Sequence, residues 1–160
     1  MRLRRWRLGA GLLILVCLLM VLIVRVATLR VASVKAGVLV QVVRMAPDNA
    51  VAHFALGQAY CDVNDLPHAI ESFQTAIQVN PEYGKAYDWL SQCYWDQGQY
   101  PQAIETWKLA KVHMPDWDWP YVHLASDYND LGRYEESITE WKQLIGREPN
   151  TAGLHVLLGN

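Results

Sequence analysis

Histidines and cysteines are the side chains in this sequence best suited to metal binding or nucleophilic chemistry. No histidine stands four residues from another with a glutamate between them, the arrangement by which one helix face binds zinc. The three cysteines form no Cys-x-x-Cys pair and no mixed His/Cys spacing typical of a metal site. The sequence therefore predicts no metal site. The five histidines are His53, His68, His113, His123 and His155.

The cysteines fall in two settings. Cys17 lies inside a long apolar run, whereas Cys61 and Cys93 lie in the more polar remainder of the chain. We interpret Cys61 and Cys93 as packing or groove residues, with a disulfide between them as the less favoured alternative. An odd number of cysteines does not settle the redox compartment.

Sequence motifs of catalysis are absent. The chain has no Gly-x-Ser-x-Gly, no phosphate-binding glycine loop and no dinucleotide fingerprint. The acidic pair Glu135 and Glu136 is interpreted as a solvated pair near a helix start rather than an acid–base pair. We therefore expect no enzyme activity and no cofactor.

Charge divides the chain into two parts. Residues 1–35 carry a formal charge of +7 without any Asp or Glu, whereas residues 36–160 carry −9. An acidic domain lacks the basic face that nucleic-acid binding requires. We therefore expect no nucleic-acid partner.

An apolar segment follows the basic residues 1–7. Residues 8–24 contain no charged side chain, and extension to residue 29 adds only Arg25. A helix needs about 20 apolar residues to cross a bilayer, and an arginine near its end can reach the interface. We predict a transmembrane helix over residues 8–29, acting as a signal-anchor. A cleaved secretory signal is the alternative, but its apolar region is usually about 7–15 residues.

The basic residues around this segment suggest an orientation. Four arginines precede it, and Arg25, Arg30 and Lys35 lie at or beyond its other end. The positive-inside rule then favours a cytoplasmic N-terminus. We expect the remainder of this single-pass membrane protein to lie on the outer or periplasmic side.

A second helix is predicted between the apolar segment and the rest of the chain. Valines in residues 30–46 recur at spacings of three and four, as on one helix face. Pro47 ends the pattern, because proline disfavours the helical conformation of the residue before it. We interpret residues 30–49 as a helical linker or a degenerate half-repeat that packs on the structure that follows.

A 34-residue period runs through the remaining chain when units start at Ala50, Gly84 and Asp118. Small residues at the eighth and twentieth places let two helices approach, and large aromatic side chains fill the space between units. The sets at places 7, 8, 11, 20, 21, 24 and 32 are Leu56, Leu90 and Leu124; Gly57, Ser91 and Ala125; Tyr60, Tyr94 and Tyr128; Ala69, Ala103 and Ser137; Ile70, Ile104 and Ile138; Phe73, Trp107 and Trp141; and Pro81, Pro115 and Pro149.

This pattern resembles the tetratricopeptide repeat (TPR) family over residues 50–149. The resemblance implies an all-α fold: a right-handed α-solenoid of helix-turn-helix repeats, preceded by the N-terminal transmembrane helix. The family's usual tryptophan near the fourth place is replaced by His53, Tyr87 and Tyr121. The implied domains are TPR 1 at 50–83, TPR 2 at 84–117, TPR 3 at 118–151 and the start of a partial fourth TPR at 152–160.

The resemblance also implies a binding groove for protein or peptide. In TPR proteins the concave surface is lined mainly by the first helix of each unit, at its second, fifth, ninth, twelfth and thirteenth places. Carried over to this sequence, these places hold aromatic side chains, amides and carboxylates. The candidate groove residues are Phe54, Gln58, Cys61, Asp62, Asp88, Gln92, Trp95, Asp96, Trp119, Ser126, Asn129 and Asp130.

The groove composition constrains the partner. TPR domains that hold chaperone C-terminal carboxylates use a basic clamp, and Phe54 stands where that clamp has a lysine. We therefore hypothesise a neutral or basic peptide segment with an apolar side chain between Trp95 and Trp119. Tryptophans in such helices more often form the core between repeats, and we assign Trp107 and Trp141 to it.

Two functions follow from different readings of the chain. The first is a membrane-anchored scaffold that binds another protein through the groove. The alternative is the anchor and TPR portion of a larger enzyme or envelope assembly factor, truncated at residue 160, which the unfinished fourth unit suggests. The apolar residues of that unit also permit a homo-oligomer formed through the end of the array.

Overall fold

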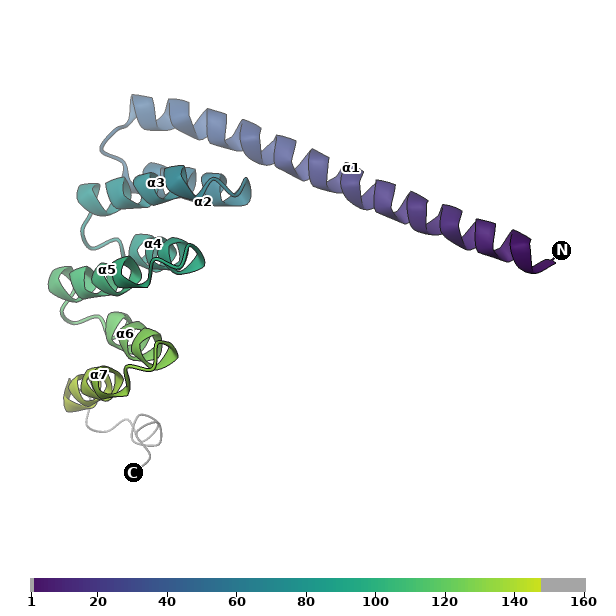
Figure 1. Ribbon diagram of the computed structural model, residues 1–160. Helices are drawn as coiled ribbons and strands as arrows, with labels where there is room; N and C mark the ends of the chain where they lie inside the picture. Colours follow the sequence, from purple (N-terminus) through teal and green to yellow (C-terminus); the bar gives the residue numbers. More distant parts are fainter. Residues whose placement is uncertain (1, 148–160) are drawn as a thin grey trace.

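The computed structural model describes residues 2–147, with side chains from residue 18 onward. All regular structure in this range is α-helical. Three helical hairpins stack on one another, and the first helix projects away from the stack (Figure 1). The expected fourth repeat at 152–160 lies outside the described residues. The helices are α1 (Arg2–Met45), α2 (Ala50–Asp62), α3 (Leu66–Val79), α4 (Gly84–Asp96), α5 (Tyr100–His113), α6 (Trp119–Asp130) and α7 (Tyr134–Arg147).

The turn inside each hairpin recurs with the 34-residue period. Asn64, Gly98 and Gly132 adopt positive φ angles of 60°, 70° and 72°. Glycine and asparagine enter this left-handed region at least cost, which explains their presence at these places. The turns expected from the sequence at these positions are therefore present, and they bring the two helices of each unit side by side.

Close approach within the first hairpin depends on Gly57. A Cβ atom added there would lie 2.5 Å from the nearest ring carbon of Phe73. No real side chain fits at that distance, so a small residue at the eighth place lets α2 and α3 meet. Beyond them, the core continues through the buried rings of Tyr87 and Trp107 to Leu124.

The fourth place of each unit links it to the turn before. The Tyr87 hydroxyl donates to the Pro81 carbonyl at 2.9 Å, and His53 Nε2 lies 2.8 Å from the Pro47 carbonyl. In the third unit Arg147 instead contacts the Pro115 carbonyl and donates to the Tyr121 hydroxyl at 2.9 Å. These side chains hold successive hairpins together where the family usually has tryptophan.

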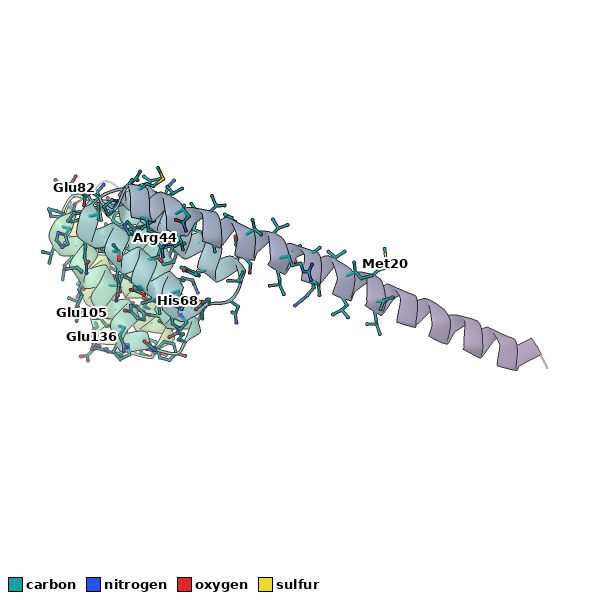
Figure 2. The ribbon with its side chains drawn as sticks, turned by 90° about the horizontal axis from the view of Figure 1, so that it is seen from above. Met20, Arg44, His68, Glu82, Glu105 and Glu136 are labelled. Atoms are coloured by element: carbon teal, nitrogen blue, oxygen red, sulfur yellow. The ribbon has the colours of Figure 1, made fainter. Side chains whose placement is uncertain are left out.

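Helix α1 has a packed part and a projecting part. Ala32 and Ala36 are buried, and this end of α1 packs on α2. Figure 2 shows Arg44 over the stack and Met20 on the projecting part. No helical stretch with described side chains is both long and apolar enough to cross a bilayer. The expected span over 8–29 also includes residues 8–17, whose side chains lie outside this description.

Candidate functional site

A cleft of about 180 Å³ opens between α4 and α6, the first helices of the second and third units. We call it the α4–α6 cleft. Its lining combines carboxylates with aromatic rings, so it differs from the apolar core beneath it. The lining residues are Asp88, Ser91, Gln92, Trp95, Trp107, His123, Asp127 and Asp130.

Two facing helical stripes form the walls. Three residues of α4 at spacings of four and three face three residues of α6 at the same spacings, because such spacings fall on one helix face. Trp107 of α5 lies between the walls, and the His123 ring stacks on it at a centroid distance of 4.4 Å and an angle of 8°. The facing stripes are Asp88, Gln92 and Trp95 on α4 and His123, Asp127 and Asp130 on α6.

An exposed tryptophan stands beside the cleft. Trp119, at the start of α6, meets the His123 ring edge-on with centroids 4.9 Å apart and remains 48% exposed. Because His123 lines the cleft, Trp119 marks its rim. A side chain entering the cleft can therefore lie against an aromatic surface outside it.

The carboxylates of the cleft have no basic partner among residues 18–147. None of the ion pairs there includes Asp88, Asp127 or Asp130. Two buried atoms, His123 Nε2 and Asp127 Oδ2, also make no hydrogen bond. Buried polar atoms are nearly always paired in native proteins. The cleft thus presents acceptor atoms that a ligand's N–H groups would satisfy.

Burial changes the ionisation of the two unpaired groups. It raises the pKa of the Asp127 carboxyl to about 6, with repulsion from Asp130 adding to the effect. Burial also lowers the pKa of His123, against a smaller opposing effect of Asp88. At neutral pH His123 is therefore uncharged and Asp127 largely ionised, which leaves the cleft with net negative charge.

The structure places four of the twelve predicted groove residues in this cleft: Asp88, Gln92, Trp95 and Asp130. Phe54 differs from the expectation. Its side chain is 7% exposed, and its ring lies 5.6 Å from Phe73 and 5.2 Å from Tyr83, centroid to centroid. The fifth place of α2 points into the core between units, so Phe54 has no surface to offer a ligand.

The other predicted residues of the first unit are engaged in contacts of their own or stand apart from the cleft. Asp62 pairs with Lys35 of α1 at 3.0 Å, and Cys61 Sγ lies 3.7 Å from Cys93 Sγ. Gln58 is half-buried on α2. These contacts fill the junction between α1, α2 and α4 with atoms of the protein itself.

The remaining predicted residues lie near the cleft or beyond it. Asp96 accepts a hydrogen bond from Gln92 at 2.7 Å, next to the cleft wall. Trp119 stands at the rim. Ser126 and Asn129 line a different cavity of about 420 Å³ between α6 and α7, together with Tyr134 and others.

Four cleft residues were missed from the sequence: Ser91, Trp107, His123 and Asp127. One cleft is lined by different places of its two neighbouring units, whereas the prediction used the same places in each. His123 and Asp127 stand four residues apart, one position past the expected fifth and ninth places. That offset is the signal that would have identified them.

Comparison with known proteins identifies the repeats. Residues 54–111 match the family described as tetratricopeptide repeat. No protein of curated function matches the chain.

Solved structures extend the likeness in fold. The chain resembles MamA with a TM-score of 0.64 and 24% identity, covering 76% of this chain and 67% of MamA. It resembles TTC0263, a thermophilic TPR protein of Thermus thermophilus, with a TM-score of 0.59 and 20% identity, over 81% and 72% of the two chains. It resembles YrrB, described as a TPR protein with an unusual peptide-binding site, with a TM-score of 0.59 and 13% identity, over 82% and 68%. Residues 54–111 thus carry the tetratricopeptide repeat, within an α-solenoid that has the TPR fold.

Proposed function

We propose that the protein is a membrane-anchored scaffold that binds a basic segment of another protein, with one lysine or arginine side chain in the α4–α6 cleft. TPR folds generally serve protein–protein interaction, and the cleft supplies the chemistry of recognition. The observation that carries the proposal is the group of three carboxylates in one cleft with no ion pair among the described residues.

A cation fits the unpaired atoms of the cleft. Lysine and arginine carry only donors, and neutral His123 Nε2 and ionised Asp127 Oδ2 both accept. Hydrogen bonds between charged groups are about twice as strong as neutral ones. A bound ammonium or guanidinium group would therefore satisfy both orphaned atoms and offset the repulsion between Asp127 and Asp130.

The aromatic rings favour a basic side chain over a metal ion. Trp95 lines the cleft and Trp119 stands at its rim. A cation near a tryptophan face gains roughly 0.5–2 kcal/mol, and arginine does so most often. The alkyl stem of the same side chain can lie along Trp119, which agrees with the apolar contact expected between these two tryptophans.

Peptide binding tests the proposal. We would measure fluorescence anisotropy with short labelled peptides that differ only in a central lysine, methionine or glutamate. The lysine peptide should bind most tightly. Changing Asp127→Asn together with Asp130→Asn should weaken its binding by about tenfold or more, since a hydrogen bond between charged groups contributes roughly 1.5–3 kcal/mol.

A charge-matched control separates the cleft from the general negative charge. Glu71→Gln with Glu82→Gln removes two carboxylates from exposed positions on α3 and the turn after it, away from the cleft. This variant should retain binding within about twofold, because exposed charges act weakly at physiological salt. Equal losses in the two double variants, or equal binding of the lysine and glutamate peptides, would reject the cleft as the site.

The anchoring part of the proposal rests on the apolar sequence of residues 8–29 and on α1. Each side chain of residues 18–24 is between 54% and 62% exposed, so the solenoid covers no face of this stretch. A helix that is apolar on all sides suits a lipid environment. With the N-terminus cytoplasmic, the solenoid would stand on the outer or periplasmic face.

Arginine substitutions test the anchor. Leu19→Arg with Ile23→Arg should reduce the fraction of full-length protein that remains in membranes after alkaline washing, since each arginine costs roughly 2.5–3.5 kcal/mol at the bilayer centre. Val34→Arg with Val38→Arg is the matched control at exposed positions of the same helix beyond the expected span. Release of both variants, or of neither, would contradict the assignment. Protease access to the solenoid from each side reports orientation.

A further inference from the structure

Two cysteines from consecutive units meet beside the cleft. Cys61 near the end of α2 and Cys93 near the end of α4 have their Sγ atoms 3.7 Å apart. Both are free thiols in this structure. A disulfide has its sulfurs roughly 2.05 Å apart, so a side-chain rotation that moves each sulfur by less than an ångström brings them to bonding distance.

The two thiols differ in access and acidity. Cys61 is half-buried, whereas Cys93 is 3% exposed. The hydrogen bond from Cys93 lowers the pKa of the Cys61 thiol, and the same bond together with burial raises the pKa of Cys93. Because the thiolate is the attacking form, Cys61 is the one that meets an external disulfide first.

We propose that Cys61 and Cys93 are a modification site, which thiol–disulfide exchange with an external disulfide converts to an intramolecular disulfide between the first and second units. The oxidant is a small-molecule or protein disulfide. From the sequence alone, simple packing is favoured over this pairing. The contact between α2 and α4 is what brings the two sulfurs together.

The exchange has two balanced steps. The Cys61 thiolate attacks one sulfur of the external disulfide, whose S–S bond breaks as the other sulfur leaves and takes up a proton from water. Cys93 then releases its proton to water and attacks Cys61 Sγ, which expels the remaining external sulfur as a second thiol. The two cysteine sulfurs are oxidised, and one external disulfide is reduced to two thiols.

The bond would tie α4 to α2 at the end of the α4–α6 cleft. Cys93 stands next to Gln92 and two residues from Trp95, both of which line the cleft. Closing a loop of about 30 residues restricts the unfolded chain, and for a solenoid of this size the melting temperature should rise by about 10 °C. Oxidation would therefore stiffen the wall of α4 without changing any residue in the cleft.

The test uses the full chain in detergent, with Cys17→Ala so that the third cysteine forms no bond between molecules. The protein is equilibrated with mixtures of oxidised and reduced glutathione, and then digested for disulfide mapping by mass spectrometry. We expect a disulfide-linked peptide pair containing Cys61 and Cys93, loss of two hydrogens from the intact mass, and the rise in melting temperature. Dithiothreitol should reverse all three.

Single variants report the order of the steps. Cys93→Ser should stop at a stable mixed disulfide between glutathione and Cys61, whereas Cys61→Ser should take up no glutathione. If the buried serine unfolds the first variant, the disulfide mapping of the native pair still decides the proposal. Thiols that stay free at every glutathione ratio, a glutathione adduct that persists beside native Cys93, or disulfide-linked dimers would each overturn it.

Discussion

The junction between the first and second units and the junction between the second and third share one repeat sequence pattern, yet their surfaces differ. At the first junction Phe54 is buried and Cys61 contacts Cys93. At the second, the α4–α6 cleft remains open with three carboxylates in its wall and rim. The repeat places that build the helices are thus compatible with either a closed or an open junction.

The difference comes from the side chains that the two junctions can pair. Lys35 of α1 reaches Asp62 at 3.0 Å, so the carboxylate at the thirteenth place of the first unit has a basic partner. Asp130, at the same place in the third unit, has none among residues 18–147. A neighbouring helix therefore decides whether an acidic position remains available to a ligand.

Truncation of the twenty-fourth place should produce the largest effect at both junctions. Phe73 is fully buried and Trp107 is 2% exposed. Phe73→Ala and Trp107→Ala should each lower the free energy of unfolding by about 3–5 kcal/mol, through lost burial and the cavity left behind. Urea unfolding followed by circular dichroism measures both. A loss below about 1 kcal/mol for either would show that its junction does not contribute to the core.

A milder substitution separates the two junctions. Trp107→Phe copies the residue of the first unit and removes part of the surface on which His123 stacks. It should weaken the lysine peptide while leaving the protein folded. The matched change at the first junction, Phe73→Leu, should leave peptide affinity unaltered. Loss of binding in both variants would instead point to a general effect of core packing.

The next effect concerns the pH dependence of stability at the open junction. An unfolded aspartate has a pKa of about 3.9, and that of Asp127 in the folded protein is about 6. Between these values the folded state binds more protons than the unfolded state, so Asp127 removes stability as pH rises through the interval. The penalty is complete above about pH 6 and absent below about pH 4.

Asp127→Asn tests this dependence. The variant should be more stable than the parent at pH 7 by about 1 kcal/mol, a figure discounted for the partial exposure of the site. The gain should vanish near pH 4, as read from urea unfolding at both pH values. The control Glu82→Gln, at an exposed position, should show no such difference. A gain for Asp127→Asn that is the same at both pH values would show that the carboxyl titrates normally.

Local features of the fold were predictable from the sequence. The turns at Asn64, Gly98 and Gly132 depend only on the conformational freedom of those residues and on the period that places them. Gly57 could be identified as a close-approach position for the same reason. Each hairpin closes through residues near one another in the chain, so a periodic sequence carries most of the information.

Contacts between units were harder to predict. The cleft joins one set of places on α4 to a different set on α6, and the Cys61–Cys93 contact joins the twelfth place of one unit to the tenth of the next. Such pairings depend on the offset between stacked helices, which the period alone does not specify. The burial of Phe54 has the same origin.

The smallest effect should come from the ion pair that distinguishes the closed junction. Lys35 and Asp62 have side chains 50% and 51% exposed, and exposed pairs contribute roughly 0–1 kcal/mol because water and salt screen them. Lys35→Met should therefore change the free energy of unfolding by less than about 0.5 kcal/mol. Its other consequence is to leave Asp62 without a partner, like Asp130. If pairing is what removes Asp62 from ligand binding, the Lys35→Met protein should bind the lysine peptide with a second, weaker site that Asp62→Asn abolishes. A titration of Lys35→Met that still fits a single site would show that Phe54, Cys61 and Cys93 close the first junction by packing alone.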